Sequence, residues 1–268
     1  MKRIFTITLF TALISANLQA QEWEAGIWGG VANYFGDLNT NTSFEFVGPA
    51  TGVFARYNAG SRFAVKTGLN FGIVAFDDAT SPHNYQNRRN LSFKSKIYES
   101  STHIEFNFFK YVRYKEELSF TPYLLTGFSL FYFNPQAEVG GAWVDLRPLQ
   151  TEGESYSSIN FAIPIGGGFK YSFTPFWTLA IEIANRKTFT DYLDDVSDEY
   201  IDQSAYQAAN GDPGQNLADP SGEVGEPIGR DGQQRGFRNK SDDFLMIGIS
   251  ISYAFRKVKC PKPGTLFN

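Results

Sequence analysis

Eight stretches of this chain alternate apolar and polar side chains with a period of two, the spacing that places side chains on the two faces of a β-strand. The stretch from 243 to 255 shows the pattern best. Its apolar face carries Leu245, Ile247, Ile249, Ile251, Tyr253 and Phe255, and its other face carries Met246, Gly248, Ser250, Ser252 and Ala254. Such a strand suits a wall between lipid and a lumen. The pattern predicts an all-β protein, an eight-stranded antiparallel transmembrane β-barrel.

The connections between these stretches are alternately short and long. The predicted strands cover residues 22–34, 50–59, 62–76, 95–109, 120–133, 158–173, 177–189 and 243–255. Outer-membrane barrels have short periplasmic turns and long external loops, so we expect both chain ends in the periplasm. An eight-stranded barrel is just wide enough for side chains to fill it, which predicts a plugged barrel without an open pore.

The first residues have the composition of a secretory signal peptide. Lys2 and Arg3 precede an apolar run from Ile4 to Ile14, and Ala20 stands at a plausible cleavage point. That run is shorter than the roughly 20 residues that a membrane-spanning helix needs, and no long uncharged apolar segment follows it. We therefore predict a signal peptide over 1–20, an outer-membrane barrel over 21–256 and a periplasmic tail over 257–268.

Composition narrows the possible partners. The net charge is −4 and no basic stripe is present, which argues against binding nucleic acid. Aromatic residues make up 16% of the chain, a surplus that the aromatic girdles of a barrel would use against the lipid of the outer membrane. The single cysteine, Cys260, excludes an internal disulfide framework. Its thiol is a candidate partner contact, with a reactive or an incidental role as the alternatives.

Several charged residues fall on the inward-facing phase of the predicted strands. They are Arg56, Lys66, Glu99, His103, Glu105, Lys170, Glu182 and Arg186. Charges of both signs in a narrow lumen of low dielectric constant are tolerated only when they are paired and hydrogen-bonded. We interpret these residues as a structural salt-bridge network.

One part of this network also has the residue types of a hydrolase. Glu99, Ser101 and His103 share one face of a strand, and a catalytic base must lie within hydrogen-bond reach of its nucleophile. Neighbours at i and i+2 are roughly 6–7 Å apart along a strand, which is too far for that bond. We therefore predict no catalytic residue and no cofactor.

Three other segments have a structural and a functional interpretation. Five acids between Asp191 and Glu199 resemble a calcium site, but their spacing does not match an EF-hand loop, so we predict a solvated acidic loop and no metal. Gly166-Gly167-Gly168 lies within a strand, where close backbone approach or sharp barrel curvature is a better explanation than a phosphate loop. The loop from Gly211 to Gly236 has little that builds a core, and we expect it to be mobile.

The segments that follow or precede the strands carry distinctive motifs. They are Gly36-Asp37-Leu38, the segment from Arg89 to Phe93, the segment from Tyr132 to Ala137, the segment from Trp143 to Leu149 with Thr151-Glu152-Gly153, and the segment from Arg186 to Val196. These five motif segments resemble those of the PorG family, outer-membrane proteins of the type IX secretion system of Bacteroidetes. The resemblance covers nearly the whole mature chain, except for 205–234.

The resemblance implies a non-catalytic component of a protein secretion machine, which in gliding bacteria also supports motility. Its implied partners are a periplasmic ring lipoprotein and the soluble partner of that lipoprotein. Because a filled barrel is too narrow to pass folded cargo, we expect an anchor that uses the turn from Tyr111 to Ser119 and the tail with Cys260. The alternatives are a small barrel that acts on lipid A, a narrow solute channel and an adhesin.

Overall fold

The computed structural model describes residues 22–111, 119–210, 216–237 and 241–255. The predicted signal peptide, most of the turn between Tyr111 and Ser119, and the tail with Cys260 lie outside these residues. Over the described part of the chain, no helix has the length and apolar character needed to cross a membrane.

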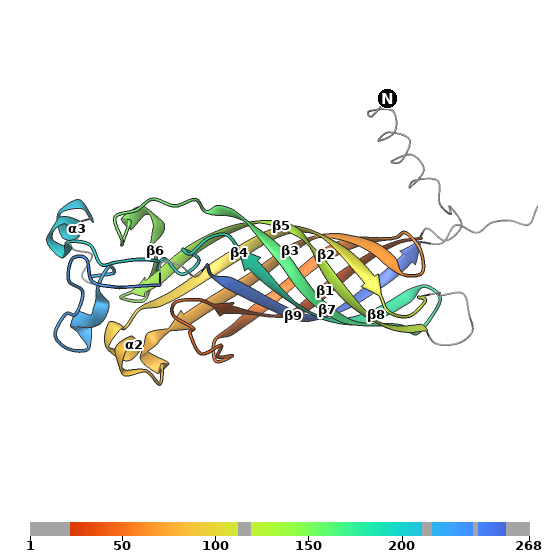
Figure 1. Ribbon diagram of the computed structural model, residues 1–268, viewed down its shortest axis with the longest axis horizontal. Helices are drawn as coiled ribbons and strands as arrows, with labels where there is room; N and C mark the ends of the chain where they lie inside the picture. The colour runs from red at the N-terminus through yellow and green to blue at the C-terminus, as the bar shows by residue number, and fades with distance from the viewer. Residues whose placement is uncertain (1–21, 112–118, 211–215, 238–240, 256–268) are drawn as a thin grey trace, which may run out of the picture.

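The described residues form one antiparallel sheet that closes on itself (Figure 1). Its strands are β1 (Glu22–Phe35), β2 (Val47–Asn58), β3 (Phe63–Asp77), β4 (Ser92–Asn107), β5 (Ser119–Val139), β6 (Ala142–Asp145), β7 (Ile159–Ser172), β8 (Trp177–Thr188) and β9 (Asp243–Phe255). The order is β4-β3-β2-β1-β9-β8-β7-β5, and pairing of β4 with β5 completes the cylinder. Since β6 pairs only with the end of β5, the described sheet is the predicted eight-stranded barrel with one added hairpin strand.

The added strand corrects the predicted end of the fifth strand. We predicted that it ends at residue 133, just before Asn134-Pro135. Instead β5 continues to Val139 and pairs with β6 beyond the point where β7 begins. Proline cannot donate to a sheet ladder, so sequence alone favours a strand end there.

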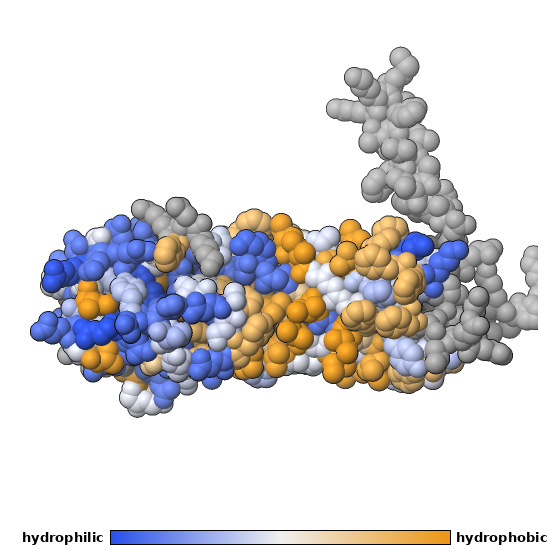
Figure 2. All heavy atoms as spheres, turned by 60° about the horizontal axis from the view of Figure 1, so that its bottom comes forward, coloured by the Kyte–Doolittle hydropathy of each residue, from blue (hydrophilic) through white to orange (hydrophobic). Residues whose placement is uncertain are grey.

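Outward and inward side chains alternate along the barrel strands, as the pattern predicts. On β9 the outward Ile249 and Phe255 are exposed, whereas the inward Ser252 and Ala254 are buried. Figure 2 shows hydrophobic residues over the barrel and polar residues gathered at one end. An apolar exterior of this kind is suited to lipid.

The two ends of the barrel differ in their connections. The long connections after β1, β3, β5 and β8 gather at one end, and we call their described residues within 36–46, 78–91, 140–158 and 189–242 the cap (Figure 1). The cap contains η1 (Asp78–Thr80), α2 (Asn84–Arg89), η2 (Arg147–Leu149), α3 (Gln203–Asn210) and η3 (Pro220–Glu223). At the opposite end, the turn end, Trp23 pairs with Phe255, so both described ends of the barrel lie there.

The three glycines of β7 allow neighbouring strands to approach closely. Gly166 and Gly168 lie between β5 and β8 in the sheet. A Cβ atom on Gly168 would lie 2.1 Å from the carbonyl oxygen of Ile181 and 2.9 Å from the Tyr123 hydroxyl. The predicted close approach of the backbone is therefore confirmed.

We expect Gly168→Ala to destabilise the barrel by about 1–3 kcal/mol, because the added methyl group overpacks the lumen wall. Equilibrium urea unfolding in lipid vesicles measures the free energy of unfolding of each variant. Gly29→Ala is the matched control, since a Cβ atom there meets nothing within 4 Å. Equal losses in the two variants would contradict the close-approach argument.

Candidate functional site

Glu105 is the centre of an ion-pair network inside the barrel. Its carboxylate lies 2.9 Å from Nε of Arg56 and 3.9 Å from Nζ of Lys66, and it accepts a hydrogen bond from Lys170. Arg56 also donates to Glu24 at 3.0 Å. The side chains of Glu105, Arg56 and Lys170 are fully buried or nearly so. Three cations around one carboxylate, with Glu24 as a second acceptor, supply the pairing that buried charges need.

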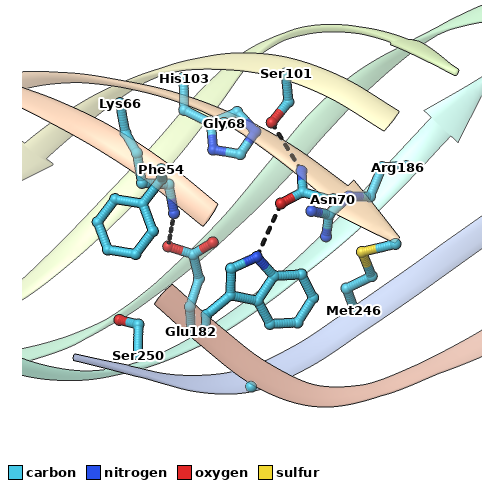
Figure 3. Close-up of a pocket in the computed structure, with 12 residues that line it drawn as sticks. Phe54, Lys66, Gly68, Asn70, Ser101, His103, Glu182, Arg186, Met246 and Ser250 are labelled. Carbon is cyan, nitrogen blue, oxygen red and sulfur yellow. Dashed lines mark hydrogen bonds and ion pairs between the residues drawn. The ribbon is translucent and has the colours of Figure 1, made fainter. Parts of the chain in front are cut away.

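Two further ion pairs extend the network toward the cap, and Figure 3 shows the first of them, between Lys66 and Glu182. Lys66 pairs with Glu182, which also accepts a hydrogen bond from the Tyr123 hydroxyl at 2.7 Å. Arg186 lies 3.3 Å from Glu99. The described ion pairs of the lumen thus consist of four cations and four carboxylates, so the charges of the network balance.

All eight residues selected from the sequence lie on inward-facing positions of the barrel, and seven take part in these ion pairs. His103 is buried but forms no ion pair within the described residues. Sequence reasoning missed Glu24, which binds Arg56, Asn58 and Ser252. Its position between the outward Trp23 and Ala25 is the signal that would have placed it in the lumen.

A cavity of about 30 Å³ remains in the lumen, lined by His103, Lys66 and Glu182 among others (Figure 3). That volume holds about two water molecules. Both ring nitrogens of His103 lack a hydrogen-bond partner in the described structure, whereas Ser101 accepts a hydrogen bond from Asn70 at 3.0 Å. No hydrogen bond joins His103 to Ser101 among the described residues.

Aromatic side chains close the lumen at the end that carries the cap. Phe131, Phe133, Phe244 and Tyr34 are fully buried there. The Phe131 ring lies 5.6 Å from that of Phe133 and 5.4 Å from that of Phe244. The ion pairs and this aromatic layer together fill the barrel.

The prediction that the acidic segment from Asp191 to Glu199 is solvated is wrong. We expected a solvated loop, but Asp194 and Asp195 are buried. Asp194 accepts a hydrogen bond from the Tyr34 hydroxyl, and Asp195 accepts one from the Tyr156 hydroxyl at 2.6 Å. The sequence does not reveal these donors, because they come from distant parts of the chain.

Part of the final loop corrects a second prediction. Residues 217–221 and 235–236 are buried in the cap, Leu217, Ala218 and Arg235 among them, whereas 222–227 and 230–234 are exposed. Arg235 donates to Glu152 at 2.8 Å and to the carbonyl oxygen of Asp195 at 2.7 Å. A single buried guanidinium therefore ties the connection after β5 to two parts of the connection after β8.

The five motif segments pack together in the cap and at the adjoining strand ends. Each contributes to one buried apolar cluster, which includes Leu38, Leu91, Phe93, Phe133, Ala137, Leu146, Leu193 and Val196. Arg89 reinforces this cluster by pairing with Asp78 at 2.7 Å and donating to the carbonyl oxygen of Arg235 at 2.7 Å. Segments that lie far apart in sequence thus form one structural unit.

Burial raises the pKa values of several aspartate side chains in the cap. Desolvation raises the pKa of Asp191 to about 7 and that of Asp195 to about 6. Burial, followed by the charge of Asp37, raises the pKa of Asp194 well above its usual value. Among the described residues, no group of three or more His, Cys, Asp and Glu side chains is arranged to hold a metal ion.

A family model described as "Domain of unknown function (DUF6089)" matches residues 2–212. The chain belongs to this family. No curated protein matches its sequence.

Solved structures similar to this DUF6089 barrel are distant in sequence. Neisserial surface protein A is 11% identical over 88% of this chain and 97% of its own, with a TM-score of 0.42. Ail, the attachment invasion locus protein of Yersinia pestis, in complex with the heparin analogue sucrose octasulfate, is 10% identical over 88% of this chain and 100% of its own, with a TM-score of 0.40. A major outer membrane protein from Thermus thermophilus is 13% identical over 88% of this chain and 100% of its own, with a TM-score of 0.39. Similarities at this level transfer no function.

We expect Glu105→Gln to destabilise the DUF6089 barrel by about 3–5 kcal/mol, because Arg56 and Lys170 lose the charge that neutralises them. The midpoint of urea unfolding in lipid vesicles measures this loss. Glu226→Gln, at an exposed position of the cap, is the control and should change the midpoint little. A Glu105→Gln variant as stable as the control would remove Glu105 from the centre of the network.

We expect the acidic segment to be most stable at low pH. Its raised folded-state pKa values mean that protons bind on folding, so the stabilisation is complete below about pH 4 and is lost as pH rises through about 6 to 7. Hydrogen exchange of residues 190–198, corrected for intrinsic rates, should be slower at pH 5.5 than at pH 8. Asp194→Asn should weaken this difference, whereas Asp231→Asn at an exposed position should keep it.

Proposed function

We propose that this DUF6089 protein is an outer-membrane component of the type IX protein secretion machinery, where it anchors or organises the periplasmic ring complex without catalysis. The observation that carries the proposal is the convergence of the five motif segments, which resemble the PorG family, on one buried cluster of the cap. Segments that form one packed unit make a more specific resemblance than isolated matches along a strand.

The exterior of the barrel supports the outer membrane as its location. Outward positions on β8 carry Trp177, Leu179, Ile181 and Ile183, all of them exposed. Aromatic side chains lie toward the turn end of several strands, including Phe120, Phe169 and Phe255. An apolar band with aromatic girdles is the usual exterior of outer-membrane barrels. In the orientation we propose, the turn end faces the periplasm and the cap faces outward.

The interior supports an anchoring role rather than transport. Buried ion pairs around Glu105 and the aromatic layer at Phe131 occupy the lumen. Secreted proteins need a far wider opening, so the pore of the machine belongs to another component. Without a hydrogen bond between His103 and Ser101, the described lumen also offers no observation in favour of an enzyme that acts on lipid A.

The contacts with the ring lipoprotein and its soluble partner are proposed to lie at the turn end. Candidate segments are the turn between Tyr111 and Ser119 and the tail 257–268 with Cys260, most of which lie outside the described residues. In a gliding host, loss of these contacts would impair both secretion and motility.

Affinity purification from the host membranes tests this proposal. We expect a tagged chain to recover the ring lipoprotein and its soluble partner, which an unrelated eight-stranded barrel with the same tag should not recover. Deletion of 257–268 should lower the recovery, and Cys260→Ser in the full chain separates the thiol from the rest of the tail. Failure to recover any ring component would reject the secretion role, whereas unchanged recovery after the deletion would reject the tail as a contact.

A further inference from the structure

Outward side chains of β3, β4 and β5 form ordered rows toward the cap. Phe71, Tyr98 and Tyr132 are paired across the three strands, and their rings are in contact. The next row toward the cap contains Ile73, Lys96 and Asn134, and the one after it contains Ala75, Lys94 and Gln136. Asp77 is paired with Ser92 one row further out. Along β3 and β4 the surface thus changes from aromatic to cationic to acidic, and Asp145 of β6 lies beside the Lys94 row, where its carboxylate accepts hydrogen bonds from Asn134 and Gln136.

This order matches the layers of a membrane surface. Aromatic rings favour the boundary between hydrocarbon and headgroups, so the row with Tyr98 lies at that boundary when the barrel lies in a bilayer. Alternate residues of a strand are about 7 Å apart along it, which places Lys96 and Lys94 in the headgroup layer. Asp77 lies beyond them, on the solvent side.

The two lysines have no carboxylate partner in the described structure. The ion pairs of the described residues include neither ammonium group. Lys94 lies 4.7 Å from the centre of the Trp143 ring, a contact that holds its ammonium group in place without neutralising it. By contrast, Lys187 on β8 pairs with Asp243 at 3.2 Å.

An open cleft of about 660 Å³ lies beside Lys94. Much of its lining is apolar, with Phe46, Val47, Pro49, Ile73, Ala75 and Trp143 among the residues. The register between β2 and β3 is irregular between Val47 and Ala50, next to this cleft. Glu45, Asp77 and Glu138 also line it, and Asp77 lies on the side away from the aromatic row.

We infer that this face of the barrel binds an anionic glycolipid of the outer leaflet, with a lipid phosphate between Lys94 and Lys96 and an apolar chain in the cleft. Unpaired cations just beyond an aromatic boundary recognise headgroup phosphates. Asp77 disfavours an anion beyond the lysines and Asp145 disfavours one on the β6 side, which leaves the space between Lys94 and Lys96 on β4 for the phosphate. The inference rests on the proposed outer-membrane location and orientation, but not on any contact with the secretion machine.

Native mass spectrometry of the purified, refolded barrel with bis-phosphorylated lipid A tests the inference. We expect the double variant Lys94→Gln/Lys96→Gln to bind this lipid at least about tenfold more weakly than the unchanged chain. Lys187→Gln is the matched control, because it removes an outward cation on β8 that already has a partner. Phosphate-free lipid A should bind the unchanged chain and the double variant equally.

The cleft is tested separately with Ala75→Trp, which fills it with a large side chain. We expect weaker binding of bis-phosphorylated lipid A, and unchanged binding would overturn the placement of the apolar lipid chain in the cleft.

The phosphate site would be overturned by equal affinity in the double lysine variant and the unchanged protein, or by an equal loss of affinity in Lys187→Gln. A shift of gel mobility on heating verifies that each variant is folded, and Lys96→Gln alone serves if the double variant does not fold. Because no ring protein is present, this result and that of the affinity purification are independent.

Discussion

Neutralisation of Glu105 is the interaction on which the interior of this barrel depends. A carboxylate without exposure to water is costly unless cations and donors surround it, and here Arg56, Lys66 and Lys170 reach it from three other strands. Strands on opposite sides of the cylinder are thereby tied through its centre. The same side chains that stabilise the barrel also occupy the space through which a solute would pass.

Buried carboxylates are also neutralised by cations in the cap. Arg235 joins Glu152 to the acidic segment, and Arg89 joins Asp78 to the final loop. These loops have little apolar surface of their own, so buried ion pairs and tyrosine–aspartate hydrogen bonds supply the order that a larger core would otherwise supply. Buried ion pairs are therefore the common element of the cap and of the barrel interior.

The outward side chains of the barrel differ along its axis and around its circumference. Rows of aromatic, cationic and acidic side chains on β3, β4 and β5 change over a distance comparable to the boundary of a bilayer. On β8 the corresponding cation, Lys187, already has a partner in Asp243, so the circumference of the barrel is not uniform. This asymmetry distinguishes the face of β3, β4 and β5, for which we infer a lipid site, from the face of β8.

What the sequence by itself determined was the barrel. Alternation on strands such as 243–255 specifies which side chains face out, because successive residues of a strand point to opposite faces. The same alternation places Glu105 and Lys170 in the lumen without reference to their partners. The predicted strand end at residue 133 was wrong, because β5 continues through Asn134-Pro135 and pairs there with β4 and β6. Only the tertiary structure decided the cap, since the buried side chains of Asp194 and Arg235 have their partners in Tyr34 and Glu152, which are distant in sequence. A periodic pattern records each residue's own environment, whereas an ion pair between loops depends on two residues whose proximity no local pattern contains.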